Sequence, residues 1–244
     1  MRKFPGSKSE ETFDTLFDRR LEIRQKKEGY RFSIDALLLA HFAEPRPADR
    51  VIDLGTGCGV IPLILAFRRK AEAIVGVEVQ PSLADLARQN VSLNRFSSQI
   101  EIWEKDFRNL PEESGAFDSA LCNPPYRRTG SGRVNPQEEK ALARHEINAT
   151  LEDVMRAANH LLKNKGRFYS IYPATRTADL LQGLRRFHLE PKRVQFVHSR
   201  SRDDARLVLV EALKEGKTQV KILPPFILYD SENQYTVQAQ ALFI

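Results

Sequence analysis

Short apolar runs alternate along most of the chain with longer segments in which apolar residues recur every three or four positions. The short runs are rich in valine and isoleucine and predict β-strands, whereas the longer segments predict amphipathic helices. This alternation is typical of a parallel sheet with helices on both faces. The first five strands of this sheet are expected at residues 51–54, 73–79, 100–106, 117–122 and 166–172.

The last part of the chain departs from this rhythm. Residues 194–198 and 205–213 read as two strands joined by the charged turn 199–204, with no helix between them. Strands joined by so short a turn must be antiparallel. A final segment that contains Pro224 and Pro225 is expected to add structure at the edge. The pattern therefore predicts an α/β fold with a seven-stranded, mostly parallel sheet and an antiparallel last strand.

An N-terminal extension precedes this alternating region. It contains a weakly alternating strand at residues 19–25 and a strongly apolar helix at residues 34–42, for which Ser33 is the expected N-cap and Asp35 a first-turn acid. Prolines at positions 45 and 47 end that helix. We therefore expect residues 1–49 to form a short extension that packs on a main domain at residues 50–244.

Composition places the chain among folded proteins with a sizeable core, since 41% of its 244 residues are hydrophobic and 29% are charged. Its 38 lysines and arginines outnumber 32 acids, and the net charge of +6 favours an anionic partner without identifying one. Two cysteines cannot build a disulfide framework, the five histidines show no metal spacing, and no run reaches the roughly 18 apolar residues that cross a bilayer. We expect a cytoplasmic protein with no membrane or metal partner.

A glycine-rich loop directly follows the first strand of the main domain. Asp53 is followed by glycines at positions 55, 57 and 59, with Thr56 between the first two. Such a loop lets the backbone approach a ligand closely, but it lacks the Lys-Ser/Thr pair of a phosphate loop. The next strand ends in Glu78, an acid able to hold two ribose hydroxyls. Loop and acid together favour a nucleoside ligand.

The third strand adds Asp106, an acceptor for an adenine amine, and Phe107, an apolar face for its ring. Tight turns and helix caps explain each such residue alone, but the series at successive strand ends describes an adenosine pocket. In these residues the chain resembles class I S-adenosylmethionine-dependent methyltransferases, which have a Rossmann-like fold; a dinucleotide-binding enzyme is the alternative. The resemblance implies S-adenosylmethionine as cofactor, with Ser33 and Asp35 either bordering its methionine end or serving only as a local helix cap. The candidate cofactor-binding residues are Asp53, Gly55, Thr56, Gly57, Gly59, Glu78, Asp106, Phe107, Asn123, Ser33 and Asp35.

The fourth strand ends in the tetrapeptide Asn123-Pro124-Pro125-Tyr126. Its prolines fix two φ angles and remove two donors, which leaves the side-chain oxygen of Asn123, the carbonyl of Pro124 and the ring of Tyr126 facing the crevice. Two acceptors and a stacking plane suit a planar amine. If both amine N–H groups donate to Asn123 and Pro124, the nitrogen can pyramidalise and present its lone pair to a methyl group, and no strong base is required.

Class I amino-methyltransferases carry this element, so the resemblance implies methylation of adenine N6, guanine N2 or a glutamine amide. Over nearly its whole length the chain resembles the bacterial valine-tRNA (adenine-N6)-methyltransferase family, on segments at residues 14–17, 20–21, 29–40, 143–144, 227–230 and 235–236. That family implies catalytic roles for Asn123, Pro124 and Tyr126, and implies adenine 37 of tRNA as substrate.

Other readings remain open at this point. They are a protein-(glutamine-N5) methyltransferase acting on release factors, an rRNA guanine-N2 methyltransferase, and a non-catalytic RNA-binding protein of the same fold. Cys58 and Cys122 are expected to be packing residues, because no histidine and acid accompany either of them. Several cations beside the crevice could follow the phosphates of a stem-loop. They are Arg127, Arg128, Arg133, Arg200, Arg202, Lys26, Lys27 and Arg31.

Overall fold

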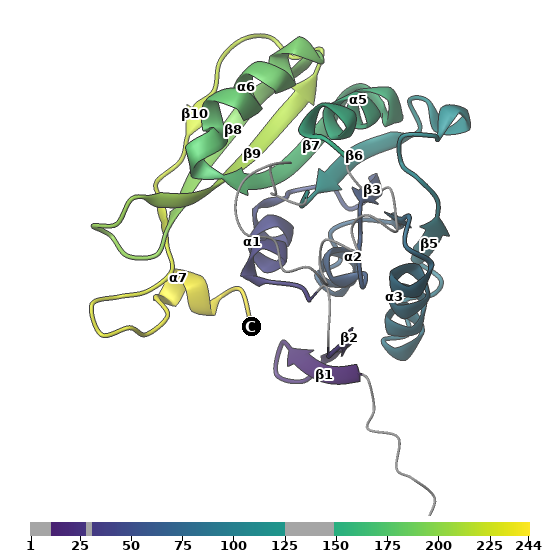
Figure 1. Cartoon of the computed structure of the whole chain (residues 1–244), viewed down its shortest axis with the longest axis horizontal. Coiled ribbons are helices and arrows are strands. Elements are labelled where there is room, and N and C mark those ends of the chain that lie inside the picture. The colour runs from purple at the N-terminus through teal and green to yellow at the C-terminus, as the bar shows by residue number, and fades with distance from the viewer. Residues whose placement is uncertain (1–10, 28–30, 125–148) are drawn as a thin grey trace, which may run out of the picture.

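The computed structural model describes residues 11–27, 31–124 and 149–244. A nine-stranded sheet runs through the molecule with helices on both of its faces (Figure 1). The strand order is β10-β8-β9-β7-β6-β3-β4-β5, and β11 also pairs with β8. The strands are β3 (Arg50–Leu54), β4 (Ala73–Glu78), β5 (Ile100–Glu104), β6 (Phe117–Cys122), β7 (Leu162–Pro173), β8 (Leu189–His198), β9 (Ala205–Lys214), β10 (Lys221–Ile222) and β11 (Phe226–Ile227).

The direction of the strands agrees with the alternation of the sequence. Strands β5, β4, β3, β6 and β7 run parallel to one another, and β9 is antiparallel to both β7 and β8. The α/β class and the antiparallel pairing of the last two long strands are thus confirmed. The expected count of seven strands is wrong, because the C-terminal segment contributes β10 and β11 on either side of Pro224 and Pro225. Prolines lack the N–H that a longer ladder requires, which keeps each of these strands to two residues.

The helices bury the two faces of the sheet in two separate apolar clusters. Val51 joins the cluster under α1, α2 and α3, whereas its neighbour Ile52 joins the cluster under α5 and α6. Successive strand side chains point to opposite faces, so runs of apolar residues fill both clusters. The helices are α1 (Ile34–Phe42), α2 (Val60–Phe67), α3 (Pro81–Leu93), α5 (Leu151–Leu161), α6 (Thr177–Arg186) and α7 (Val237–Gln240), with 3-10 turns η1 (Pro111–Glu113) and η2 (Ala174–Arg176).

The N-terminal extension forms a hairpin followed by α1. The hairpin, β1 (Glu11–Leu16) paired with β2 (Leu21–Lys26), lies beside α3 and below α2 in Figure 1. The sequence predicted only one of these strands. Helix α1 begins after Ser33 as expected, and at its other end the Lys70 ammonium donates to the carbonyls of Ala40, His41 and Ala43. These bonds satisfy carbonyls that the end of the helix leaves unpaired. The division into residues 1–49 and 50–244 stays a prediction.

One edge of the sheet collects the expected site residues. Because β3, β4, β5 and β6 are parallel, their carboxyl ends lie at the same edge, where open α/β sheets bind ligands. In the register, Leu54 pairs with both Val77 and Cys122, so the glycine loop, Glu78 and Asn123 follow neighbouring strand ends. Within the described ranges no helix has the length and apolarity that crossing a membrane requires.

Candidate functional site

The glycine loop turns sharply between β3 and α2 and is fastened to β4. The amides of Gly55 and Thr56 both donate to the carbonyl of Val77 at 2.9 Å. All three glycines of the loop have positive φ, and at Gly59, with φ of +83°, a Cβ would also lie 3.2 Å from the Cβ of Ala87. Only glycine adopts this conformation without strain, so the loop runs close against α3. It leads directly into the first turn of α2.

Glu78 closes the other side of the loop. The residue is 5% exposed, and its carboxylate accepts the amide N–H of Gly57 at 3.0 Å and that of Gln80 at 2.9 Å. Each carboxylate oxygen can accept more than one hydrogen bond, which leaves capacity for hydroxyl donors. Glu78 therefore shapes the glycine loop, a role that the sequence did not predict, and its predicted role in ligand binding stays a prediction.

Asp53 is the most unusual group at this edge. Its side chain is fully buried, and within the described part of the chain neither carboxylate oxygen has a hydrogen-bond partner of ordinary geometry; the same holds for the hydroxyl of Thr56. Burial, the largest cause, raises the pKa of Asp53 to about 7, the Thr56 side chain lowers it, and the charge of Glu78 raises it further. A buried acid pair of this kind favours a proton or a cationic ligand group.

This burial predicts a pH dependence of stability. In the folded protein the pKa of Asp53 lies above the value of 3.8 typical of an unfolded chain. Its contribution to the free energy of unfolding is therefore fully present below about pH 4 and is lost as the pH rises to about 7, by up to roughly 4 kcal/mol. Asparagine at this position does not titrate. The difference in the free energy of unfolding between wild type and Asp53→Asn, measured by urea unfolding from pH 4.5 to 8, should therefore change across this window. Parallel curves would contradict the burial of an ionising Asp53.

Asp106 and Phe107 lie just beyond the end of β5. The Asp106 carboxylate binds Arg108, whose Nε lies 2.9 Å from both carboxylate oxygens, and this bond is the main cause of its lowered pKa. An adenine amine at Asp106 would thus share the carboxylate with Arg108. Phe107 is half-buried and lines a cavity of about 440 Å³ that reaches Ala157 on α5.

Asn123 and Pro124 follow β6, and Pro124 is buried while Asn123 is half-buried. Because β6 pairs with β3, they lie beside the strand that carries Asp53. Tyr126 lies outside the described residues, as do Arg127, Arg128 and Arg133. Ser33 caps α1 by accepting the amide N–H of Asp35 at 3.3 Å, which supports its local role.

The cysteines take no part in this chemistry. Cys58 and Cys122 are free and buried, and burial raises the pKa of Cys58 to about 12 and that of Cys122 well above its usual value. Neither is a thiolate at neutral pH. No cluster of three or more metal-binding side chains occurs in the ranges that the structure describes.

Sequence reasoning missed Gly76 and Asn90. Gly76 pairs with Asp53 in the register, and a Cβ at this position would lie 2.9 Å from the Thr56 Cγ2 atom and 3.0 Å from its Oγ1. A lone glycine inside an apolar strand marks a close approach and could have identified it. Asn90 is completely buried on α3 and donates to the carbonyl of Cys58 at 2.9 Å. An asparagine within a helical segment gives no signal in the sequence that it is buried.

The polar groups at this edge of the sheet fit S-adenosylmethionine. Glu78 offers buried acceptors, the glycine loop offers a close backbone approach, and the unpartnered Asp53 carboxylate makes the edge favourable for the cationic end of this cofactor. The roles of the individual residues stay predictions.

Comparison with known proteins agrees with this geometry. A protein from Porphyromonas gingivalis named tRNA1(Val) (adenine(37)-N6)-methyltransferase is 31% identical over 206 residues, which are 81% of this chain and 80% of that protein. A Haemophilus influenzae protein of the same name is 27% identical over 89% of this chain and 91% of its own length. A solved structure titled a predicted O-methyltransferase, from Agrobacterium tumefaciens, has a TM-score of 0.68 at 24% identity and covers 85% of this chain and 94% of its own.

Another solved structure is geranyl diphosphate C-methyltransferase from Streptomyces coelicolor with S-adenosyl-L-homocysteine bound; it has a TM-score of 0.52 at 16% identity and covers 73% of this chain and 76% of its own. At such identities the solved structures establish the class I methyltransferase fold alone. The family model described as the methyltransferase small domain matches residues 33–182, from the N-cap of α1 into α6. The chain belongs to the methyltransferase small domain family.

Proposed function

We propose that this protein methylates the N6 amine of an adenine in tRNA, with S-adenosylmethionine as methyl donor and adenine 37 of valine tRNA as the preferred site. The observation that carries the proposal is the Asn-Pro-Pro-Tyr tetrapeptide at the end of β6, the strand that pairs with the one before the glycine loop. The name shared by the Porphyromonas and Haemophilus relatives supports the choice of substrate.

The cofactor would be held along the ends of β3, β4 and β5. The Glu78 carboxylate would accept the ribose hydroxyls, and Asp106 and Phe107 would take the adenine edge and face. When bound, S-adenosylmethionine supplies a methyl group on a cationic sulfur as the electrophile. The acidic pair Asp53 and Glu78 favours that positive end electrostatically.

The chain's own contribution to the reaction is to orient the amine. Oδ1 of Asn123 and the carbonyl of Pro124 would each accept one N–H of the adenine amine, which turns the nitrogen lone pair toward the donor. The aromatic ring of Tyr126 would hold the flipped base by stacking. The amine loses its proton readily once methylated, so a carbonyl or water can accept it and no catalytic base is required.

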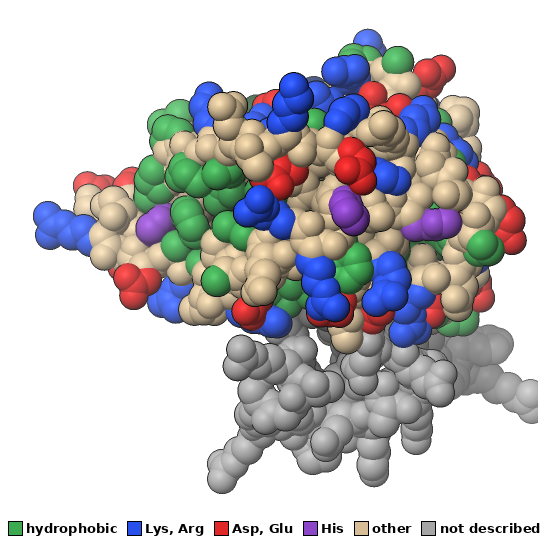
Figure 2. All heavy atoms as spheres, turned by 90° about the horizontal axis from the view of Figure 1, so that it is seen from above, with side chains coloured by type: hydrophobic (Ala, Val, Ile, Leu, Met, Phe, Trp, Pro, Cys, Tyr) green, Lys and Arg blue, Asp and Glu red, His purple; other side chains and the backbone are tan. Residues whose placement is uncertain are grey.

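The tRNA is expected to approach the carboxyl edge of the sheet. Figure 2 shows the side above α5 and α6, where lysine and arginine side chains are interspersed with acids. On α6, Arg186 pairs with Glu152 at 2.9 Å and Arg185 pairs with Glu190 at 3.2 Å. Arg200 and Arg202 are exposed in the turn after β8, where Arg200 also pairs with Asp203 at 3.9 Å. This turn lies at the same edge as the end of β6, because β6 and β8 both run parallel to β7. We therefore expect this turn to contact the phosphates of the tRNA. The enzyme is expected to be cytoplasmic.

A direct assay tests the proposal. Purified protein, S-adenosylmethionine and unmodified tRNA are incubated, and the tRNA nucleosides are then analysed by mass spectrometry. N6-methyladenosine should accumulate in valine tRNA. Parallel reactions contain release factor or ribosomal RNA in place of tRNA. Methylation of release factor alone, or N2-methylguanosine formed only in ribosomal RNA, would contradict the proposal and favour the corresponding alternative.

A further inference from the structure

Two asparagines, Asn90 on α3 and Asn94 at its C-cap, act as extra peptide groups along β2. Oδ1 of Asn90 accepts the amide N–H of Arg24 at 2.8 Å, and its Nδ2 donates to the carbonyl of the same residue at 3.0 Å. One turn later Asn94 makes the same two bonds to Glu22, at 2.9 and 2.7 Å. A side-chain amide has the donor and acceptor of a backbone unit, so α3 pairs with the edge of the N-terminal hairpin.

The second side-chain N–H group has a different acceptor in the two asparagines. That of Asn94 returns to the carbonyl of Asn90 within the same helix, at 2.8 Å. That of Asn90 donates to the carbonyl of Cys58 in the glycine loop, at 2.9 Å. Because both N–H groups and the oxygen of Asn90 are occupied, its amide cannot be flipped without opposing like groups. One planar, fully buried amide thus joins β2 to the glycine loop.

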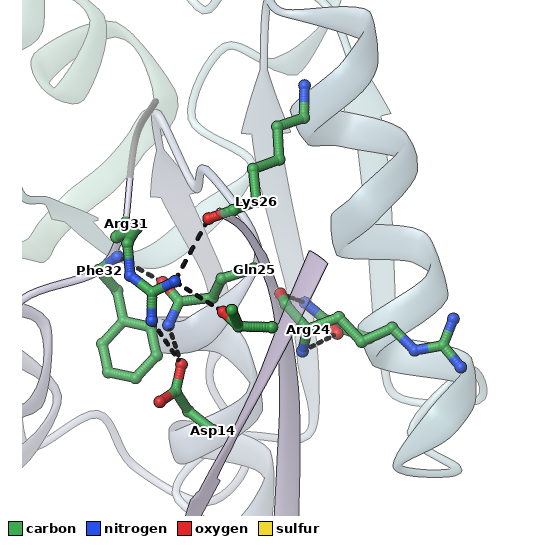
Figure 3. Close-up of polar contacts among 8 residues, drawn as sticks. Asp14, Arg24, Gln25, Lys26, Arg31 and Phe32 are labelled. Atoms are coloured by element: carbon green, nitrogen blue, oxygen red, sulfur yellow. Dashed lines mark hydrogen bonds and ion pairs between the residues drawn. The ribbon is translucent and has the colours of Figure 1, made fainter. Parts of the chain in front are cut away.

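Gln25, the residue after Arg24, connects β2 to the segment before α1. Gln25 is 2% exposed; its Oε1 accepts the amide N–H of Phe32 at 2.8 Å, and its Nε2 donates to Oδ2 of Asp14 at 2.5 Å. Arg31 also binds Asp14, at 3.0 Å, and Figure 3 shows these side chains pointing toward one another. Phe32 directly precedes the N-cap of α1.

This network lies close to the glycine loop. Burial dominates the raised pKa of Cys58, but the charges of Arg31 and Asp14 also act on its thiol. Arg31, which the sequence grouped with phosphate-binding cations, is exposed but donates to Asp14 and to the hydroxyl of Thr12 at 2.6 Å.

We propose that Asn90 and Gln25 are positioning residues of the cofactor pocket, which hold the glycine loop and the start of α1 at a fixed separation through β2. The inference rests on the proposed function, because the start of α1, with Ser33 and Asp35, is expected to border the methionine end of the cofactor. Neither positioning residue touches the reacting amine. Their loss should weaken cofactor binding and leave the methyl-transfer step unchanged once the pocket is filled.

Calorimetric titration of the full chain with S-adenosylmethionine tests this role. Asn90→Ala should raise the Kd about tenfold, since it frees the Cys58 carbonyl and lets the loop move. Asn94→Ala is the matched control, because it removes an equivalent pair of bonds to β2 but none to the loop; its Kd should stay within about twofold of wild type. At saturating cofactor, kcat on tRNA should change less than twofold in both variants, a split that a general loss of structure would not produce.

Gln25→Ala supplies a second variant that leaves the Asn90 amide intact. It should also raise the Kd for S-adenosylmethionine, and it tests the positioning role if Asn90→Ala does not fold. Unchanged affinity in the folded variants, or an equal loss in Asn94→Ala, would overturn the positioning role and leave the proposed function standing. Failure of the wild-type protein to bind S-adenosylmethionine would overturn the proposed function, and the positioning role with it.

Discussion

Asn123→Ala is expected to lower kcat for tRNA methylation by about 100- to 1000-fold, with the Kd for S-adenosylmethionine changed by less than threefold. The exocyclic nitrogen of adenine is a poor nucleophile because its lone pair is delocalised into the ring. Two acceptors, Asn123 Oδ1 and the carbonyl of Pro124, are proposed to hold its N–H groups so that the lone pair is released. Alanine removes one acceptor, and the amine can then rotate out of the reactive orientation.

The comparison variants make this result specific. Asn123→Asp keeps an acceptor oxygen and should retain more activity than Asn123→Ala. Asn164→Ala alters an exposed asparagine near the start of β7, at the opposite edge of the sheet, and should leave kcat within about twofold of wild type. Steady-state assays with saturating tRNA and cofactor measure all three. An Asn123→Ala enzyme that works as fast as the Asn164→Ala enzyme would remove Asn123 from the reaction.

Glu78→Gln is expected to raise the Kd for S-adenosylmethionine about 100-fold. The Glu78 carboxylate accepts the amides of Gly57 and Gln80, and it is proposed to accept the ribose hydroxyls as well. An amide NH2 in place of one oxygen turns an acceptor into a donor, so a buried N–H and one hydroxyl both lose their partner. The same change should lower the free energy of unfolding by about 1–3 kcal/mol.

The neighbouring strand offers a matched control. Glu104 pairs with Glu78 in the register of β4 and β5, but it is exposed and binds Arg88 at 3.3 Å. Glu104→Gln therefore removes the same charge from an equivalent strand end and should change the Kd by less than threefold. Calorimetry compares the two variants. Equal losses of affinity would mean that the effect of Glu78 comes from net charge alone and not from its bonds to the loop.

The positions of the main strands along the chain and the acids at their ends could be predicted from the sequence, because both arise from local patterns. The valine- and isoleucine-rich runs follow the pleat of buried strands, and the loop from Gly55 to Gly59 needs conformations that glycine adopts most easily. Helix α1 was predicted to its last residue, since Ser33 marks its start and the prolines after it mark its end. These features require no knowledge of distant partners.

The contacts that fasten the site depend on partners far apart in the chain. Arg24 of β2 bonds Asn90 of α3, which lies 66 residues away in the chain, and no local pattern indicates such pairing. The buried Gln25 bonds the backbone of Phe32, a contact that the weak alternation of this segment does not indicate either. Asn90 resembles a solvent-facing helical residue in the sequence, yet it is buried. Strands β10 and β11 are too short to give a periodic signal. Sequence reasoning thus named candidate ligand-binding residues from local motifs, but it did not find the residues that hold these motifs in place.

The most direct test of the account is a crystal structure of this protein with S-adenosyl-L-homocysteine. The account predicts that the ribose hydroxyls bind the Glu78 carboxylate, that the adenine lies against Phe107, and that the sulfur lies on the side of the pocket where Asn123 and Pro124 end β6. A ligand bound away from the glycine loop, or an Asn123 side chain turned away from the ligand sulfur, would contradict it.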